Sequence, residues 1–201
     1  HGASIWSDVK VYQNYCYCVN ETGGGIQIIS LEQIDTWVYP HTATVNTILD
    51  VSVNGETKLT STAHNVYVDE INGILYVLGS VDPEENSFIL NRHPQHPSSG
   101  FNYMFALNSN IVSGASAQQP ILINHQEIYF HDLVTYTYND SKTYAYASGE
   151  DTGIYVLDVT DPFNWDQKHI LDDYQQYTGV SGYMHQIWYS SDGRYIFAND
   201  E

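Results

Sequence analysis

Apolar and polar positions alternate in short runs along this chain, and the runs recur in pairs. Four runs open with a small polar pair and continue as alternating positions, at 7–12, 64–68, 131–136 and 185–189. A second run rich in β-branched and aromatic residues follows each one closely, at 15–19, 74–78, 143–147 and 194–198. Runs of this composition predict strands, so the repeated unit is a β-hairpin. Its starts near residues 7, 64, 131 and 185 are spaced 57, 67 and 54 residues apart.

A third strand extends the repeat. Gly-rich turns at 23–25 and 151–153 precede the apolar runs 26–31 and 154–159, and a weaker copy covers 99–107. Repeats of this length with several short strands are typical of β-propeller blades. We therefore expect an all-β chain in which residues 1–201 form about three blades and the start of a fourth. Propellers usually close with about four to eight blades, so this would be a fragment of a larger ring; the alternative is a compact open sandwich.

The balance of charge narrows the choice of partners. The net charge is −18 with only six Lys and Arg, which repels phosphate backbones and argues against a nucleic-acid partner. No run approaches the ~20 continuous apolar residues of a transmembrane segment. An acidic, Tyr-rich, strand-rich chain suits an extracellular or cell-surface protein, whose carboxylates either bind hard cations such as calcium or only keep the surface soluble.

Three groups of residues are candidates for chemistry or modification. Cys16 and Cys18 alternate on one strand, which predicts two packed free thiols or, alternatively, a thiolate metal pair. Asn20 and Asn139 each begin an Asn-x-Ser/Thr sequon, so both are N-glycosylation candidates in a eukaryotic source. The segment 82–99, with several prolines and histidines, lengthens the second repeat and predicts a surface loop.

Histidine recurs where the first strands begin. His64, His131 and His185 occupy equivalent positions in three of the four repeats, with Asp8 and Asp132 beside them. First strands line the channel of a propeller, so these side chains should converge and could hold zinc, iron or copper. The alternative is structural, with each imidazole bonded to the backbone of the neighbouring blade and locking the ring.

The repeat also resembles a known family. The segments that carry the likeness are 6–12, 63–66, 130–132, 149–162, 184–188 and 199–201, and together they span nearly the whole chain. In this order they resemble the choice-of-anchor B family of surface proteins built from LVIVD-type repeats. The resemblance implies a β-propeller, an exported or surface-attached protein and no established catalytic activity. The chain departs from the family pattern between residues 82 and 116.

Two function classes follow. The first is a non-enzymatic binding or structural module, with the remainder of its own propeller or another protein subunit as partner. The second is a metal-dependent oxidoreductase or hydrolase at a His-lined channel. Because the sequence contains no Gly-x-Ser-x-Gly and no phosphate-binding Gly-rich loop before a helix, it predicts no catalytic or cofactor-binding residue by motif. The first class is therefore our prediction.

Overall fold

The chain folds entirely into β-structure over the part that can be described. The computed structural model describes residues 7–32, 34–36, 38, 43–53, 56–60, 62–80, 100–150, 153–171 and 184–200. Within these ranges there are sixteen strands, one short 3-10 turn at Ile34–Thr36 and no α-helix. The prediction of an all-β chain is therefore confirmed.

Twelve of the strands form three antiparallel sheets in which neighbours in sequence are neighbours in the sheet. The β1 sheet contains β1 (Ser7–Tyr12), β2 (Tyr15–Asn20), β3 (Ile26–Ser30) and β4 (Val45–Ile48). The β7 sheet contains β7 (Asn65–Asp69), β8 (Ile74–Ser80), β9 (Phe101–Ala106) and β10 (Ile121–Gln126). The β11 sheet contains β11 (Asp132–Thr137), β12 (Thr143–Ser148), β13 (Ile154–Asp158) and β14 (Asp166–Leu171).

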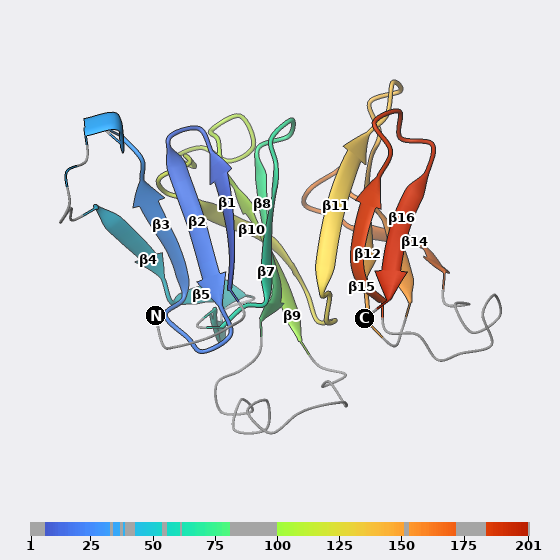
Figure 1. Cartoon of the computed structure of the whole chain (residues 1–201), viewed down its shortest axis with the longest axis horizontal. Helices are drawn as coiled ribbons and strands as arrows, with labels where there is room; N and C mark the ends of the chain where they lie inside the picture. Colours follow the sequence, from blue (N-terminus) through green and yellow to red (C-terminus); the bar gives the residue numbers. More distant parts are fainter. Residues whose placement is uncertain are drawn as a thin grey trace.

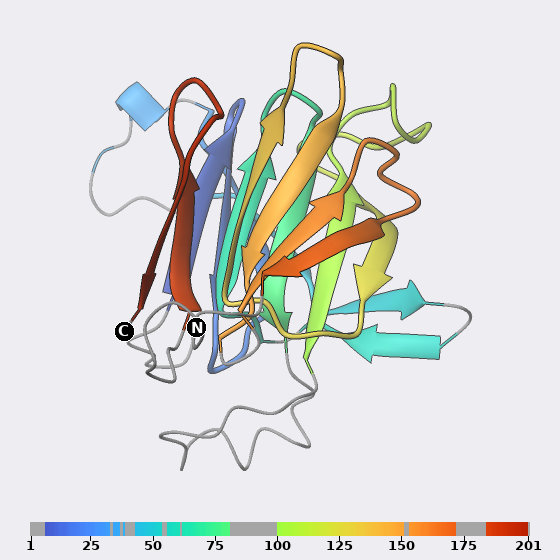
Figure 2. The ribbon, with the colours of Figure 1, turned by 90° about the vertical axis from the view of Figure 1, so that its right-hand side faces the viewer.

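Two hairpins complete the described strands. The β15 hairpin pairs β15 (Met184–Tyr189) with β16 (Ile196–Asp200) and follows the β11 sheet. The second hairpin pairs β5 (Asp50–Val53) with β6 (Glu56–Leu59) and connects the β1 sheet to the β7 sheet. Figure 2 shows β5 and β6 near the end of the sheets where the first strands begin.

The first strands of the four units lie next to one another in chain order. β1 contacts β7, β7 contacts β11, and β11 contacts β15. Figure 1 shows the β1 sheet, the β7 sheet, the β11 sheet and the β15 hairpin side by side. None of the sheets closes on itself. This arrangement brings equivalent positions of the repeat together, because the first strands run in the same direction from the same end of the molecule.

Two apolar cores hold the sheets face to face. The first core joins the β1 sheet to the β7 sheet, with Tyr17, Ile26 and Ile28 facing Leu75 and Tyr103. The second core joins the other face of the β7 sheet to the β11 sheet, through Tyr76, Leu78 and Met104 against residues that include Phe130 and Leu133. Because side chains alternate between faces, a strand between two cores is apolar at every position. Residues 74–78 of β8 are all apolar and buried for this reason.

The Gly-rich turn predicted at 23–25 connects β2 to β3. All three glycines have positive φ, which disfavours other residues. A Cβ at Gly25 would stand 2.3 Å from the carbonyl oxygen of Ile48, so the close approach of this turn to the end of β4 also requires glycine.

The predicted strands agree with the observed ones to within two residues at each predicted start. The fourth strands of the sheets and the β5–β6 hairpin were not predicted, because their sequences lack a repeated pattern. The segment 82–99 lies outside the described residues.

Candidate functional site

Polar residues gather where the first strands begin. His64 and His131 immediately precede β7 and β11, and His185 is the second residue of β15. The register of β15 with β16 shifts between Met184 and Gln186, which marks a local bulge beside this histidine. Since the first strands are neighbours, the start of each strand is brought to the start of the next.

The three imidazoles form a row, which we call the histidine row. The ring centroids of His64 and His131 are 3.9 Å apart, and those of His131 and His185 are 4.2 Å apart. The planes of neighbouring rings are tilted by 49° and 44°. The sequence-based expectation that these side chains converge thus agrees with the geometry, since three consecutive units supply one ring each.

A carboxylate from the first unit lies at one end of the row. Nδ1 of His64 lies 2.5 Å from Oε1 of Glu21, a residue of the turn after β2. Both side chains are partly buried. The pair connects the β1 sheet to the start of β7. Glu21 was not singled out from the sequence, although Glu150 is its counterpart in the third repeat, because each glutamate lies between the second strand and the Gly-containing turn before the third strand.

Asp8 and Asp132 bond to the backbone of the next first strand. Oδ2 of Asp8 accepts the N–H of Val66 at 3.2 Å, and Oδ2 of Asp132 accepts the N–H of Ile187 at 3.2 Å. The two acceptors are equivalent in the repeat, and so are the two donors. The same type of bond therefore joins β1 to β7 and β11 to β15.

The remaining junction, between β7 and β11, uses an amide. Asn65 Nδ2 donates to Oδ1 of Asp132 at 3.1 Å, and the same oxygen accepts the N–H of Leu133 at 2.9 Å. The carboxylate of Asp132 thus accepts hydrogen bonds from three donors, one each on β7, β11 and β15. Asp8 has one further partner, because Nζ of Lys10 lies 2.6 Å from its Oδ2.

Burial and hydrogen bonding shift the pKa of Asp132 in opposite directions. Burial raises the pKa of this carboxyl above 3.8, while the N–H groups of Ile187 and Leu133 lower it, and burial is the larger effect. The fully buried Ser148 supports the same junction, since its hydroxyl accepts the N–H of Asp132 at 2.9 Å and donates to the carbonyl of His185 at 3.0 Å.

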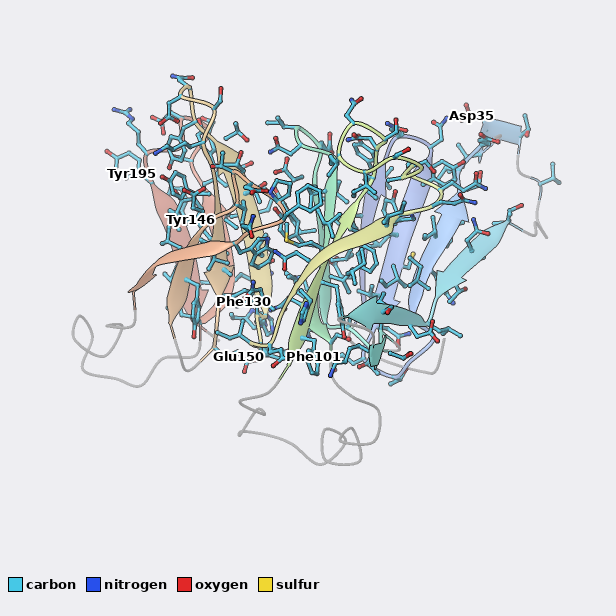
Figure 3. The ribbon with its side chains drawn as sticks, turned by 180° about the vertical axis from the view of Figure 1, so that it is seen from behind. Asp35, Phe101, Phe130, Tyr146, Glu150 and Tyr195 are labelled. Atoms are coloured by element: carbon cyan, nitrogen blue, oxygen red, sulfur yellow. The ribbon has the colours of Figure 1, made fainter. Side chains whose placement is uncertain are left out.

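A buried acidic residue also lies at this end. Glu150 is 5% exposed, and its carbonyl accepts the N–H of Met184, which joins the β11 sheet to the β15 hairpin. Figure 3 shows Glu150 at the same end as Phe101, with Tyr146 and Tyr195 toward the opposite end.

Metal-binding residues were predicted at His64, His131, His185, Asp8 and Asp132. The structure brings all five to the starts of adjacent first strands, with the histidines in the row and the two aspartates bonded to backbone. Among the described residues, no group of three or more histidine, cysteine or acidic side chains is arranged to hold a metal ion. The described residues also contain no helix whose length and apolar character would let it cross a membrane.

The candidate modification sites differ in exposure. Asn20 is the last residue of β2 and is 4% exposed, and its Oδ1 accepts the N–H and hydroxyl of Thr22. Asn139 lies exposed in the turn between β11 and β12. Cys16 and Cys18 are both free thiols, with their Sγ atoms 3.6 Å apart on one face of β2.

The bonds made by Asp8 and Asp132 were missed by sequence reasoning. The signal was present, since an Asp or Asn is the second residue of three of the four polar openings. Its role could be recognised only once the neighbouring first strand was in place to donate.

No protein-family model matches this sequence, and no curated protein matches it.

Proposed function

We propose that this chain forms part of a β-propeller and serves as a non-enzymatic binding or structural module outside the cell or on its surface. Three four-stranded antiparallel sheets and a following hairpin, with their first strands adjacent in chain order, are what consecutive blades would look like. The likeness to choice-of-anchor B proteins points the same way. The partner would be the remainder of the propeller or another subunit that supplies further sheets.

The engagement of Asp8 and Asp132 with neighbouring backbone carries this proposal. Catalytic carboxylates need an oxygen that can reach substrate, metal or water. Here the carboxylates accept N–H groups of the adjacent first strands, as a residue that holds sheets together would do. The polar strand starts therefore favour a structural role over chemistry.

The surface supports an extracellular setting. The net charge of −18 keeps a Tyr-rich strand protein soluble, and Asn139 presents a sequon on an exposed turn. Labelling of intact source cells with a membrane-impermeant amine reagent tests this part. A surface protein is labelled through its lysines before lysis, whereas labelling only after lysis would contradict the location.

A metal-dependent oxidoreductase or hydrolase is the second candidate. The observation that favours it is the histidine row, because zinc, copper and iron bind imidazole nitrogen and three imidazoles converge. Calcium fits the row poorly, since it prefers oxygen ligands.

Metal analysis of the protein, purified without added metal or chelator, separates the two candidates. His131→Ala removes the central ring of the row, and His125→Ala, on β10, serves as the matched control. We expect far less than one metal ion per chain in all three proteins. One equivalent of zinc, copper or iron that is lost only in His131→Ala would overturn the non-enzymatic proposal.

A further inference from the structure

The histidine row shows how far each unit is turned relative to the next. His64, His131 and His185 come from three consecutive units and occupy equivalent positions of the repeat. One step leads from His64 to His131, and a second step leads from His131 to His185. Equivalent side chains in the same rotamer are related by the rotation that relates their units. The geometry of the row therefore contains the rotation between neighbouring sheets.

The two steps of the row are nearly equal. The imidazole centroids are 3.9 Å apart in the first step and 4.2 Å apart in the second, and the imidazole planes are tilted by 49° and 44°. The junctions at either side of this pair of steps are also alike, because Val66 and Ile187 each donate an N–H at 3.2 Å to the aspartate of the preceding unit. Side chains placed independently of one another would not repeat these quantities. The row is therefore an arc with a regular step.

The tilt between neighbouring imidazoles is close to the full rotation between units. The tilt equals the rotation when the normals of the planes are perpendicular to the rotation axis, and it is smaller than the rotation otherwise. Centroids of aromatic pairs usually lie about 4.5–7 Å apart, and a closer approach requires that faces rather than edges are turned toward each other. The normals thus follow the line from one centroid to the next, which runs around the axis. Each unit is therefore turned by about 44–49° from its neighbour.

We infer that the complete molecule is a closed circle of seven or eight such units, to which this chain contributes three four-stranded sheets and the first hairpin of a fourth unit. Rotations of about 51° and about 45° divide a circle into seven and eight units, and a rotation of about 60° divides it into six. The observed tilts of 49° and 44° lie beside the first two values and well below the third. This inference rests on the proposed function, because it treats the sheets as consecutive blades. The number of units, and not the chain that supplies them, follows from the rotation.

The same two quantities give the distance of the histidine row from the axis. Points about 4 Å apart that are separated by a rotation of about 46° lie on a circle with a radius of about 5 Å. A zinc ion needs nitrogen ligands at about 2.0–2.1 Å, so an ion on the axis would be out of reach of all three imidazoles. The histidines therefore line the wall of a central channel, and this position supports the non-enzymatic role proposed above.

Electron microscopy of the protein as isolated from its source tests the number of units. Class averages viewed along the axis show the blades of a propeller as separate radial sheets, which can be counted. We expect seven or eight units around a central channel. A closed circle of six or fewer units, or of nine or more, would overturn the inference.

The outcomes separate this inference from the proposed function. A closed circle of six units would overturn the number of units and leave the propeller and its non-enzymatic role in place. Seven or eight units, together with one equivalent of metal that is lost only in His131→Ala, would overturn the non-enzymatic role and leave the number of units in place. An assembly in which the sheets form no closed circle would overturn both.

Discussion

Individual polar side chains at the strand starts join one sheet to the next. The carboxylate of Asp132 receives the N–H groups of Ile187 and Leu133 and the amide of Asn65, so three donors depend on one residue. A buried donor that loses its acceptor keeps the cost of its desolvation without the compensating bond. The contribution of such a residue is therefore measured best by removing it.

Asp132→Ala should lower the free energy of unfolding by about 1–3 kcal/mol, because it leaves buried N–H groups without an acceptor. Asp140→Ala is the matched control, since Asp140 accepts the N–H of Lys142 on an exposed turn where water can replace it. Denaturant unfolding of both variants measures the difference. Equal, small losses would show that Asp132 does not stabilise the junction.

The raised pKa of Asp132 predicts that the stability of the protein depends on pH. Burial holds the folded-state pKa of Asp132 above its ordinary value of 3.8. In the pH range between 3.8 and the raised pKa, the carboxyl group therefore takes up a proton when the chain folds. The contribution of this carboxyl to the free energy of unfolding is therefore present below pH 3.8 and falls as the pH rises through the raised pKa. Relative to Asp132→Ala, wild-type protein should lose stability across that window in thermal melts. A relative gain would contradict the raised pKa.

Exposure of the two sequons predicts where a glycan is attached. When the chain is expressed through a eukaryotic secretory pathway, Asn139 should be modified and Asn20 should not, because the amide of Asn20 is buried and bonded to Thr22. Asn139→Gln should abolish the mass shift that a glycosidase removes, and Asn20→Gln should leave it intact. A shift lost in Asn20→Gln would show that this strand end is accessible during folding.

At the scale of elements, the β15 hairpin is attached to the β11 sheet through its turn as well as through its strands. Gly193 has a φ of 66°, and a Cβ there would stand 2.3 Å from the ring of Tyr136. The carbonyl of Gly193 accepts the hydroxyl of Tyr138 at 3.1 Å. Backbone conformation and packing therefore both require glycine at this position.

Gly193→Ala should destabilise the protein more than Gly114→Ala does. Both glycines have positive φ, which costs another residue about 1–2 kcal/mol, but a Cβ at Gly114 would meet only Ile121 at 3.9 Å. The clash with Tyr136 adds a further penalty of about 1–3 kcal/mol, the usual cost of overpacking. Thermal melts of the two variants measure the difference, and a larger loss in Gly114→Ala would contradict the packing argument.

At the scale of the whole molecule, stability should decrease from the middle of the stack toward its ends. β8 lies between the two cores and is buried along its whole length, whereas β1 alternates between exposed and partly buried residues and residues 196–199 of β16 are exposed. Backbone amides exchange hydrogen more slowly where the free energy of local opening is larger. Segments with one covered face should open more readily than a strand enclosed on both sides.

We therefore expect peptides that contain β8 to exchange most slowly and peptides that contain β16 to exchange fastest among the described strands. Mass spectrometry of hydrogen exchange measures this order. Uniform protection across all strands at low concentration would contradict the two-core description.

The sequence by itself predicted the first three strands of each four-stranded sheet and their order along the chain. Alternation of apolar and polar side chains at 7–12 and 131–136 predicts strands locally, and glycines at 23–25 predict the turn that follows β2. The fourth strands were not predicted, since the sequences of β4, β10 and β14 share no pattern. The recurrence of histidine predicted that His64, His131 and His185 would be equivalent.

Only the tertiary structure decided what those equivalent positions do. The distance between neighbouring imidazoles and the pairing of His64 with Glu21 depend on how adjacent sheets pack, which no local pattern contains. The same holds for Asp8 and Asp132, whose partners are backbone groups more than fifty residues away along the chain. Backbone N–H groups are present in every residue except proline, so sequence cannot show which of them will be presented to a given side chain.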